Sequence, residues 1–268
     1  MSDHAYPTSL GASTPDTISL FGHDLAEDLM GKVGFGELAF WLLARRRPTR
    51  GEVRVFETVL VALADHGFTP TAIAARMTWL SAPDSLQGAI ASGLLGGGSR
   101  FLGVTEDCGR FLSDVLTKHA DDRPADDAPD EAWDELALTA VREQREAGRF
   151  VPGLGHPVHK ERDPRTPRLF AIAEEEGLLG PHLRLFAGIG RVHEQVLGRR
   201  LPLNGAGVCG AALADLDLPP ELLRGVALLA RTAGLLGQIA EEQVHPLARD
   251  IYLHVDRAST YLDAESEG

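Results

Sequence analysis

Apolar residues recur every three or four positions along nearly the whole chain, and no segment alternates convincingly between apolar and polar residues. Phe35, Leu38 and Leu42 follow this spacing near the start, and the pattern resumes from Val53 to Leu63. A period near 3.6 places apolar side chains on one face of a helix, whereas half-buried strands require strict alternation. The sequence therefore predicts an all-α fold without internal repeats.

Helix start signals divide the chain into segments. Thr49 begins a capping-box pattern, Thr69 precedes a proline at the first helical position, and Asp84 is a further candidate N-cap. The helix after Thr69 is expected to bury Ile73 and Met77, which share one face. Helices are expected at about residues 35–47, 49–67, 70–80, 84–94, 133–149, 167–176, 183–197, 205–213 and 219–243.

The last and longest of these helices contains three glycines, Gly225, Gly234 and Gly237. Glycine inside a helix costs roughly 1 kcal/mol relative to alanine. Their presence predicts close packing of this helix against another helix or a ligand.

The composition restricts the class of protein. A chain of 268 residues with 44% hydrophobic and 24% charged residues can bury a large core, either as one domain or as a major and a minor lobe. The formal charge of −13 argues against a nucleic-acid-binding protein. It also means that an anionic substrate would need a locally positive pocket.

The N-terminal stretch and the cysteines bear on localisation. Residues 1–20 are rich in Ser, Thr, Pro and Gly, lack an apolar targeting segment, and are expected to form a flexible tail. No uninterrupted apolar run is long enough to span a membrane. Cys108 and Cys209 lack metal-ligand spacing and are expected to be reduced thiols, so a cytoplasmic location and no metal site are predicted.

The segment 153–168 combines features suited to an anionic ligand. Glycines stand before His156, and Lys160 and three arginines follow. Glycine lets the backbone approach a ligand, and clustered cations suit phosphates or carboxylates. Prolines at 157, 164 and 167 argue against a regular helix here. The residue types alone leave a solvated basic loop and an anion-binding loop equally open.

Two motifs in this segment resemble the signature loop of the citrate synthase superfamily. Gly153–His156 reads Gly-Leu-Gly-His, and Asp163–Arg165 reads Asp-Pro-Arg. The superfamily includes the citryl-CoA-cleaving domain of ATP-citrate lyase. Four further stretches resemble the family in the expected order: Ala64–Gly67, Gly93–Phe101, Ala230–Gly234 and Glu241–Pro246.

The resemblance implies a role for individual residues. His156 would contact the keto oxygen of oxaloacetate, and His66 would face the same half of the ligand, so these two are the predicted catalytic residues. Three other histidines have no comparable support and are expected to be surface or structural residues: His159, His182 and His193. Arg165 and Arg231 would bind carboxylates through their two-pronged guanidinium groups, with Arg100 as a third substrate-binding residue.

The resemblance also implies how coenzyme A would be held. The backbone of Gly153, Leu154 and Gly155 would help to hold the adenine, and Lys160 would meet phosphates. A CoA thioester and an oxo acid are then substrates, and no permanently bound cofactor is expected. Neither a nucleic acid nor a membrane is an expected partner.

The chain departs from the family at two places. Citrate synthases carry a thioester-polarising histidine in the stretch that matches Gly96–Arg100, and none is present here. Ala206 stands where the family has an aspartate that handles the proton on the acetyl carbon, and Asp215 and Asp217 lie too far along to replace it. Either another group does this work, the reaction differs, or catalysis is lost.

The resemblance therefore implies a citrate-synthase-like domain over residues 21–268, with a smaller helical lobe over about 166–225. The favoured function is cleavage of citryl-CoA, or a related 3-hydroxyacyl-CoA, to acetyl-CoA and an oxo acid. A non-catalytic CoA-ester-binding protein is the alternative, and a citrate or methylcitrate synthase is the least favoured. A homodimer or larger homo-oligomer is expected.

Overall fold

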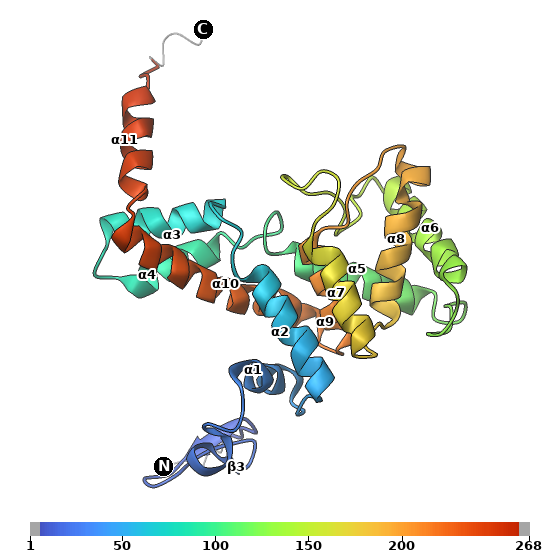
Figure 1. Cartoon of the computed structure of the whole chain (residues 1–268), viewed down its shortest axis with the longest axis horizontal. Coiled ribbons are helices and arrows are strands. Elements are labelled where there is room, and N and C mark those ends of the chain that lie inside the picture. The colour runs from blue at the N-terminus through green and yellow to red at the C-terminus, as the bar shows by residue number, and fades with distance from the viewer. Residues whose placement is uncertain (1–5, 263–268) are drawn as a thin grey trace.

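The computed structural model describes residues 6–262, and helices dominate it, which confirms the predicted fold class (Figure 1). The helices are α1 (Phe35–Ala44), α2 (Arg50–Ala64), α3 (Pro70–Ser81), α4 (Leu86–Leu95), α5 (Val104–Lys118), α6 (Asp130–Glu146), α7 (Arg165–Glu175), α8 (Pro181–Leu197), α9 (Gly205–Asp215), α10 (Pro220–Val244) and α11 (Ala248–Ala258). A short π-helix, η1 (Leu25–Leu29), precedes α1.

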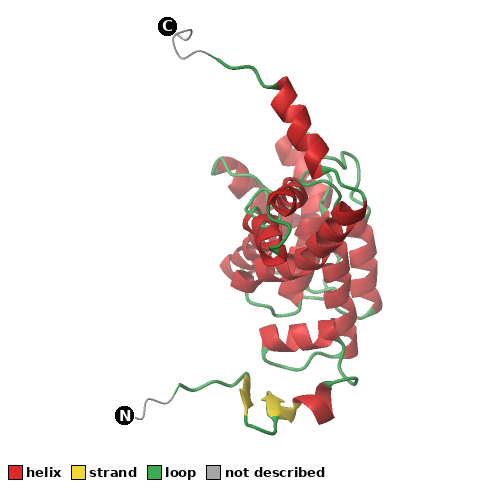
Figure 2. Cartoon of the chain, turned by 90° about the vertical axis from the view of Figure 1, so that its left-hand side faces the viewer, coloured by secondary structure: helices red, strands yellow, loops and turns green. Residues whose placement is uncertain are grey.

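A small antiparallel sheet lies before the helices (Figure 2). Its strands are β1 (Gly11–Ser13), β2 (Ile18–Leu20) and β3 (His23–Asp24). The prediction of a flexible tail over residues 1–20 was therefore wrong for β1 and β2, while residues 1–5 lie outside the described part. Phe21 and Gly22 adopt positive φ angles and turn the chain between β2 and β3. The ring of Phe21 then stacks on that of Trp41 at 5.2 Å, which attaches the sheet to α1.

Local capping signals placed two helix starts correctly. Thr49 and Glu52 form the predicted capping box before α2, and the Thr69 hydroxyl accepts a hydrogen bond from Ala72 before α3. The buried face of α3 was predicted wrongly. Ala72, Ala75 and other small or paired residues are buried instead of Ile73 and Met77, because α4 and α10 pack closely on that face.

Two other helix boundaries differ from the sequence prediction. The residue that precedes α4 is Ser85, and not Asp84. α7 begins at Arg165, so the segment 153–168 is a loop only up to Pro164. Pro167 falls in the first turn of α7, where a helix has no intrahelical partner for the backbone N–H that proline lacks.

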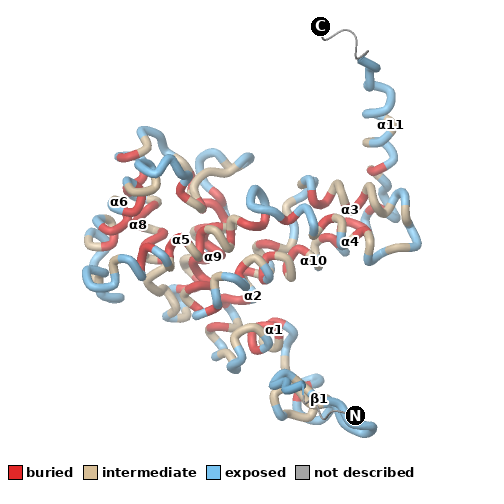
Figure 3. The backbone as a smooth tube through the Cα atoms, turned by 180° about the vertical axis from the view of Figure 1, so that it is seen from behind, coloured by how far each residue is buried: buried red, intermediate tan, exposed pale blue. Residues whose placement is uncertain are grey.

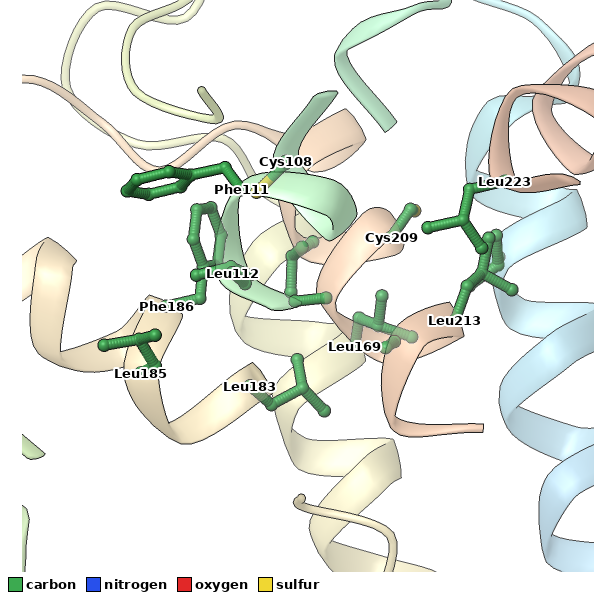
Figure 4. Packing of buried hydrophobic residues seen from close by; sticks show 14 of the residues in the cluster. Cys108, Phe111, Leu112, Leu169, Leu183, Leu185, Phe186, Cys209, Leu213 and Leu223 are labelled. Carbon is green, nitrogen blue, oxygen red and sulfur yellow. The ribbon is translucent and has the colours of Figure 1, made fainter. Parts of the chain in front are cut away.

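α9 is the centre of the larger hydrophobic core. It contacts α2, α5, α7, α8 and α10, and nine of its 11 residues are buried. Its sequence of glycines and alanines allows these neighbours to approach closely. Cys209 and Leu213 of α9 lie among leucines from α5, α7 and α10 (Figure 4).

A second, smaller hydrophobic cluster joins α3 and α4 to the C-terminal half of α10. It is formed by Ala75, Ala89, Leu235 and Ile239. Buried side chains of α7, α8 and α9 belong to the larger cluster, together with those of α2 and α5. A separate lobe over about residues 166–225 stays a prediction.

α10 joins the two clusters and is the helix in the described part that is long and apolar enough to span a membrane. Its apolarity has another explanation, because Leu223, Val226 and Ala227 lie in the larger core and Leu235 and Ile239 in the smaller one. α11 follows α10 and projects from the helical body, largely exposed (Figure 3).

The three glycines of α10 are not equivalent. A side chain at Gly234 would overlap the carbonyl oxygen of Ala64, at the end of α2, whereas side chains at Gly225 and Gly237 would meet nothing within 4 Å. The prediction of close packing therefore holds for Gly234 alone. Its position lets α10 approach the α2–α3 connection, which carries His66.

We expect Gly234→Ala to destabilise the protein by about 1–3 kcal/mol, because the added methyl group forces the backbones of α2 and α10 apart. Gly225→Ala and Gly237→Ala are the matched controls and should each stabilise by roughly 0.5–1 kcal/mol through helix propensity. Urea unfolding of the three variants measures the difference. Equal effects at all three positions would contradict the close approach at Gly234.

Candidate active site

A cavity of about 890 Å³ lies where the α2–α3 connection, the segment before α5, the loop before α7 and the first turn of α9 meet. Eight of the nine residues predicted as functional lie in its wall: His66, Arg100, Gly153, Leu154, Gly155, His156, Arg165 and Arg231. Ala206 also lines it. The structure thus brings together residues that are far apart in the sequence.

The glycine loop is held against the segment before α9. Gly153 and Gly155 have φ angles of +86° and +85°, which a residue with a side chain rarely adopts. The Gly155 N–H donates to the carbonyl of Pro202, and the side-chain amide of Asn204 donates to the Gly155 carbonyl at 2.8 Å. Asn204 also caps α9 by accepting from Gly207. The loop and α9 are therefore positioned as one unit.

The hydrogen bonds of His156 determine which ring nitrogen carries the proton. Its Nδ1 accepts from the backbone N–H groups of Val158 at 3.1 Å and His159 at 3.0 Å. In the neutral ring the proton must then lie on Nε2. Burial, assisted by the neighbouring imidazole of His159, lowers the pKa of His156 to about 4. At neutral pH this residue is therefore an uncharged hydrogen-bond donor in the cavity wall.

Three histidines form a cluster at this place. The His156 ring lies 5.2 Å from that of His66 and 4.5 Å from that of His159, measured between ring centres. Sequence reasoning gave His159 only a surface or structural role, because nothing local indicates that the loop folds back toward His66. The structure places His159 half-buried beside both predicted catalytic histidines.

The histidine cluster also bears on metal binding. One ring nitrogen from each of His66, His156 and His159 lies within 4.8 Å of the others, which is close enough for the three to bind one metal ion. A metal on Nε2 of His156 would move the ring proton to Nδ1, where two backbone N–H groups already donate. The arrangement fits a proton donor better than a metal ligand, and the absence of a metal site stays a prediction.

Arg231 is a buried cation without a hydrogen-bonding partner on two of its nitrogens. The residue is only 5% exposed, and among the described residues Nε and Nη1 have no hydrogen-bond acceptor. Its nearest carboxylate oxygen belongs to Asp65, 4.0 Å from Nη1. Burial lowers the pKa of Arg231. A buried guanidinium that lacks hydrogen-bond acceptors is costly, so a cavity wall with this group is suited to an anionic ligand.

Arg165 is already partly engaged. Its Nε and Nη2 donate to the two oxygens of Asp163 at 3.0 Å and 2.7 Å, and Nη1 donates to the Ala62 carbonyl. Burial alone would raise the pKa of Asp163, but hydrogen bonds from Arg165 and from the Gly205 N–H lower it to about 2. Arg165 therefore has only the remaining N–H groups of Nη1 and Nη2 for a ligand. The Asp-Pro-Arg motif serves first to join α7 to the start of α9.

The other predicted residues lie at the edge of the site. Arg100 is exposed at the cavity wall, in the segment before α5. Lys160 is exposed and donates to the His156 carbonyl at 3.2 Å, outside the cavity lining. Ala206 does line the cavity, from the first turn of α9, which is where a carboxylate in its place would reach a ligand.

The structure adds residues that sequence reasoning had not assigned. Asn204 could have been found, since an asparagine before a glycine-rich helix is an N-cap signal. Phe68, Phe101 and Phe150 line the cavity although each is exposed. Asp107 lines it too, and nothing around this residue in the sequence distinguishes it from the other acids of α5.

Asp215, His182 and His193 lie outside the cavity lining and have structural contacts. The Asp215 carboxylate accepts from the backbone N–H groups of His182 and Leu183 and so caps α8. His193 is buried, and its two ring nitrogens pair with backbone groups of Ile189 and Leu201. A surface or structural role for His182 and His193 was predicted from the sequence, whereas Asp215 had been considered only as a replacement for the family's aspartate.

Comparison with known proteins identifies the family. The sequence profile of the family described as "Citrate synthase, C-terminal domain" matches residues 17–251. The chain belongs to this family. ATP-citrate synthase beta chain protein 1 of Oryza sativa subsp. japonica is 25% identical over 237 residues, which make up 82% of this chain and 36% of that protein. The chain thus spans about a third of the length of the curated relatives that it matches.

Solved structures of the family have the same fold. Citryl-CoA lyase from Hydrogenobacter thermophilus is similar with a TM-score of 0.82 and 27% identity, over 97% of this chain and 96% of that one. The ATP citrate lyase of Methanosaeta concilii, solved as a variant in complex with (3S)-citryl-CoA, is similar with a TM-score of 0.74 and 20% identity. That match covers all of this chain and 43% of the other. The second likeness shows the fold alone.

The low pKa of His156 makes stability depend on pH in a predictable direction. Below pH 6.5 the unfolded chain binds a proton at this residue, whereas the folded protein does so only near its pKa of about 4. The free energy of unfolding should therefore fall as the pH falls from 6.5 to 4. In His156→Asn the side-chain oxygen can still accept from Val158 and His159, but nothing titrates, so this fall should be smaller. Urea unfolding at pH 7.5 and pH 5 measures it, and an unchanged pH dependence would contradict the assignment.

Proposed function

We propose that this protein is a carbon–carbon lyase that cleaves citryl-CoA, or a related 3-hydroxyacyl-CoA, to acetyl-CoA and an oxo acid. The observation that carries the proposal is the buried guanidinium of Arg231, whose Nε and Nη1 have no hydrogen-bond acceptor among the described residues, in the same cavity as the Nε2–H donor of His156. A ligand with carboxylates next to a hydroxyl or keto oxygen satisfies both groups. The likeness to a citryl-CoA lyase over nearly the full length of both chains supports the choice of substrate.

Binding of the citryl half follows from the charges in the wall. Arg231 pairs with one carboxylate, and the free N–H groups of Arg165 pair with a second. Asp163 holds the Arg165 guanidinium in a fixed plane, so its remaining donors are oriented before the ligand enters. His156 donates from Nε2 to the hydroxyl oxygen, which becomes the keto oxygen of the product.

Cleavage requires the hydroxyl proton to leave as the carbon–carbon bond breaks. The proton passes to a base, for which we propose His66, because His156 already carries a proton on the nitrogen that faces the ligand. The electrons of the broken bond form the enolate of acetyl-CoA, and this enolate must then take up a proton at carbon.

The CoA portion is proposed to lie along the exposed part of the cavity. Phe101 and Phe150 offer exposed aromatic faces for an adenine ring, and Arg100 and Lys160 offer cations for phosphates. The Gly153–Gly155 backbone lines the same cavity as Arg100 and the two aromatic rings. Contacts of this kind are exposed, so the affinity for CoA should fall as the salt concentration rises.

Two measurements test the proposal. Incubation with (3S)-citryl-CoA should yield acetyl-CoA and oxaloacetate. Liquid chromatography measures the acetyl-CoA, and an NADH-coupled malate dehydrogenase assay measures the oxaloacetate. Calorimetry with CoA and acetyl-CoA, at low and high salt, tests binding by itself. Binding without cleavage would favour the second candidate, a non-catalytic CoA-ester-binding protein, for which Ala206 is the specific observation. The absence of both binding and cleavage would overturn both candidate functions. Synthesis of citrate from acetyl-CoA and oxaloacetate would favour a citrate synthase.

We also propose that the protein forms a homodimer or larger homo-oligomer through α11. Ala248, Ile251, Tyr252 and Val255 are spaced as one apolar stripe, yet only Ala248 is buried within the chain. A second copy of the chain can cover this stripe. Light scattering after size exclusion should report an oligomer that Tyr252→Asp and Val255→Asp shift toward monomer, whereas a monomeric wild type would refute this.

The two buried free thiols, Cys108 and Cys209, suit the proposed cytoplasmic location.

A further inference from the structure

We propose that Asp107 is the carboxylate that exchanges the proton with the acetyl carbon, in place of the aspartate that is absent at Ala206. This inference rests on the lyase function proposed above. Asp107 is the only carboxylate side chain among the described residues that line the cavity. It belongs to the first turns of α5, whereas Ala206 belongs to the first turn of α9.

Residues next to Asp107 pack against α9 and the glycine loop, and Asp107 itself lines the same cavity as Ala206. A side chain at Gly210 of α9 would overlap the carbonyl oxygen of Thr105, two residues before Asp107. Cys108, directly after Asp107, lies with its sulfur 3.0 Å from where a side chain at Gly153 would begin. The first turns of α5 therefore contact both α9 and the glycine loop, and these two segments also supply residues to the cavity wall.

The electrostatic surroundings of Asp107 suit proton transfer. Its nearest cation is Arg224 of α10, with Nη2 at 3.8 Å, and Arg224 itself pairs more closely with Glu106 at 3.0 Å. Arg110 and Glu106 are the other charged groups near it on α5. Burial, with Glu106 as a smaller cause, raises the pKa of Asp107. By contrast, the carboxylate of Asp163 accepts hydrogen bonds from Arg165 and Gly205, and that of Asp65 accepts from Gln238 and Gly67. Neither carboxylate is therefore free to exchange a proton with the acetyl carbon.

The proposed step balances in both directions. In cleavage, the carboxylic acid of Asp107 gives its proton to the terminal carbon of the enolate, which becomes the methyl group of acetyl-CoA, and Asp107 becomes a carboxylate. In the reverse direction the carboxylate removes a methyl proton and the enolate forms again. The side chain of Asp107 is 43% exposed, so it can regain a proton from water through the open part of the cavity.

Hydrogen exchange of the acetyl-CoA methyl group in deuterated water, with oxaloacetate present, tests this step. Mass spectrometry should show exchange with the wild type and a loss of about 10²–10⁴-fold with Asp107→Asn. Asp114→Asn is the matched control, since Asp114 is exposed on the same helix and outside the cavity lining. Ala206→Asp in the Asp107→Asn background should restore exchange, because it returns a carboxylate to the cavity wall at the position of the family's aspartate.

The outcomes separate the two proposals. If the wild type cleaves citryl-CoA and Asp107→Asn exchanges at the wild-type rate while still binding CoA, the role of Asp107 is refuted and the lyase stands. If the wild type binds CoA but neither cleaves nor exchanges, both proposals fail. Asp107→Glu should keep part of the exchange, whereas a purely structural role would make it as harmful as Asp107→Asn. Loss of CoA binding in Asp107→Asn together with failure of the Ala206→Asp rescue would also count against the proposal.

Discussion

His156→Asn is expected to slow the cleavage of citryl-CoA by about 10²–10⁴-fold. The asparagine oxygen can replace Nδ1 as acceptor for the N–H groups of Val158 and His159, so the loop keeps its conformation. The shorter side chain has no donor at the position of Nε2–H, which we propose to face the ligand. The variant therefore removes the donor to the developing keto oxygen and little else.

Steady-state kinetics with citryl-CoA measures this effect, and we expect it in kcat more than in KM. His182→Asn provides a matched control, because His182 pairs with Asp215 at 2.8 Å and lies outside the cavity lining. A His156→Asn enzyme with the wild-type kcat would show that the donor to the reacting oxygen is another group.

The second large effect concerns Arg231. Arg231→Met should weaken the binding of citrate or oxaloacetate by about 10–100-fold, since a hydrogen bond to a charged group contributes roughly 1.5–3 kcal/mol. Arg231→Lys should lose most of the same affinity, because the ammonium group cannot form the two-pronged contact. In both variants the affinity for CoA should change little.

The same substitution has an unusual expected effect on stability. Because Nε and Nη1 of Arg231 have no acceptor among the described residues, Arg231→Met should leave the ligand-free protein as stable or make it more stable. Arg76→Met is the control. Arg76 is 1% exposed and pairs with the buried Glu242 at 2.7 Å, so its loss should cost about 3–5 kcal/mol. Equal destabilisation by both variants would mean that the ion pair of Arg231 with Asp65 outweighs the cost of burying a guanidinium without hydrogen-bond acceptors.

Features that depend on residues close together in the sequence were predicted from the sequence alone. The capping box at Thr49 and the N-cap at Thr69 both formed, because each bond joins residues at most three positions apart. Family resemblance in the segment 153–168 singled out His156 and Arg165, resemblance in Ala230–Gly234 singled out Arg231, and all three line the cavity. Helical periodicity identified the fold class.

Features that depend on contacts between distant segments were decided by the tertiary structure. The face of α3 that carries Arg76 is buried because Gln238 and Glu242 of α10 bind its guanidinium, which no local pattern reveals. Arg165 reaches Ala62, and His159 comes to lie beside His66, only because the loop before α7 packs against the end of α2. Asp107 enters the cavity because α5 packs against α9, and residues near it in the sequence carry no trace of that contact.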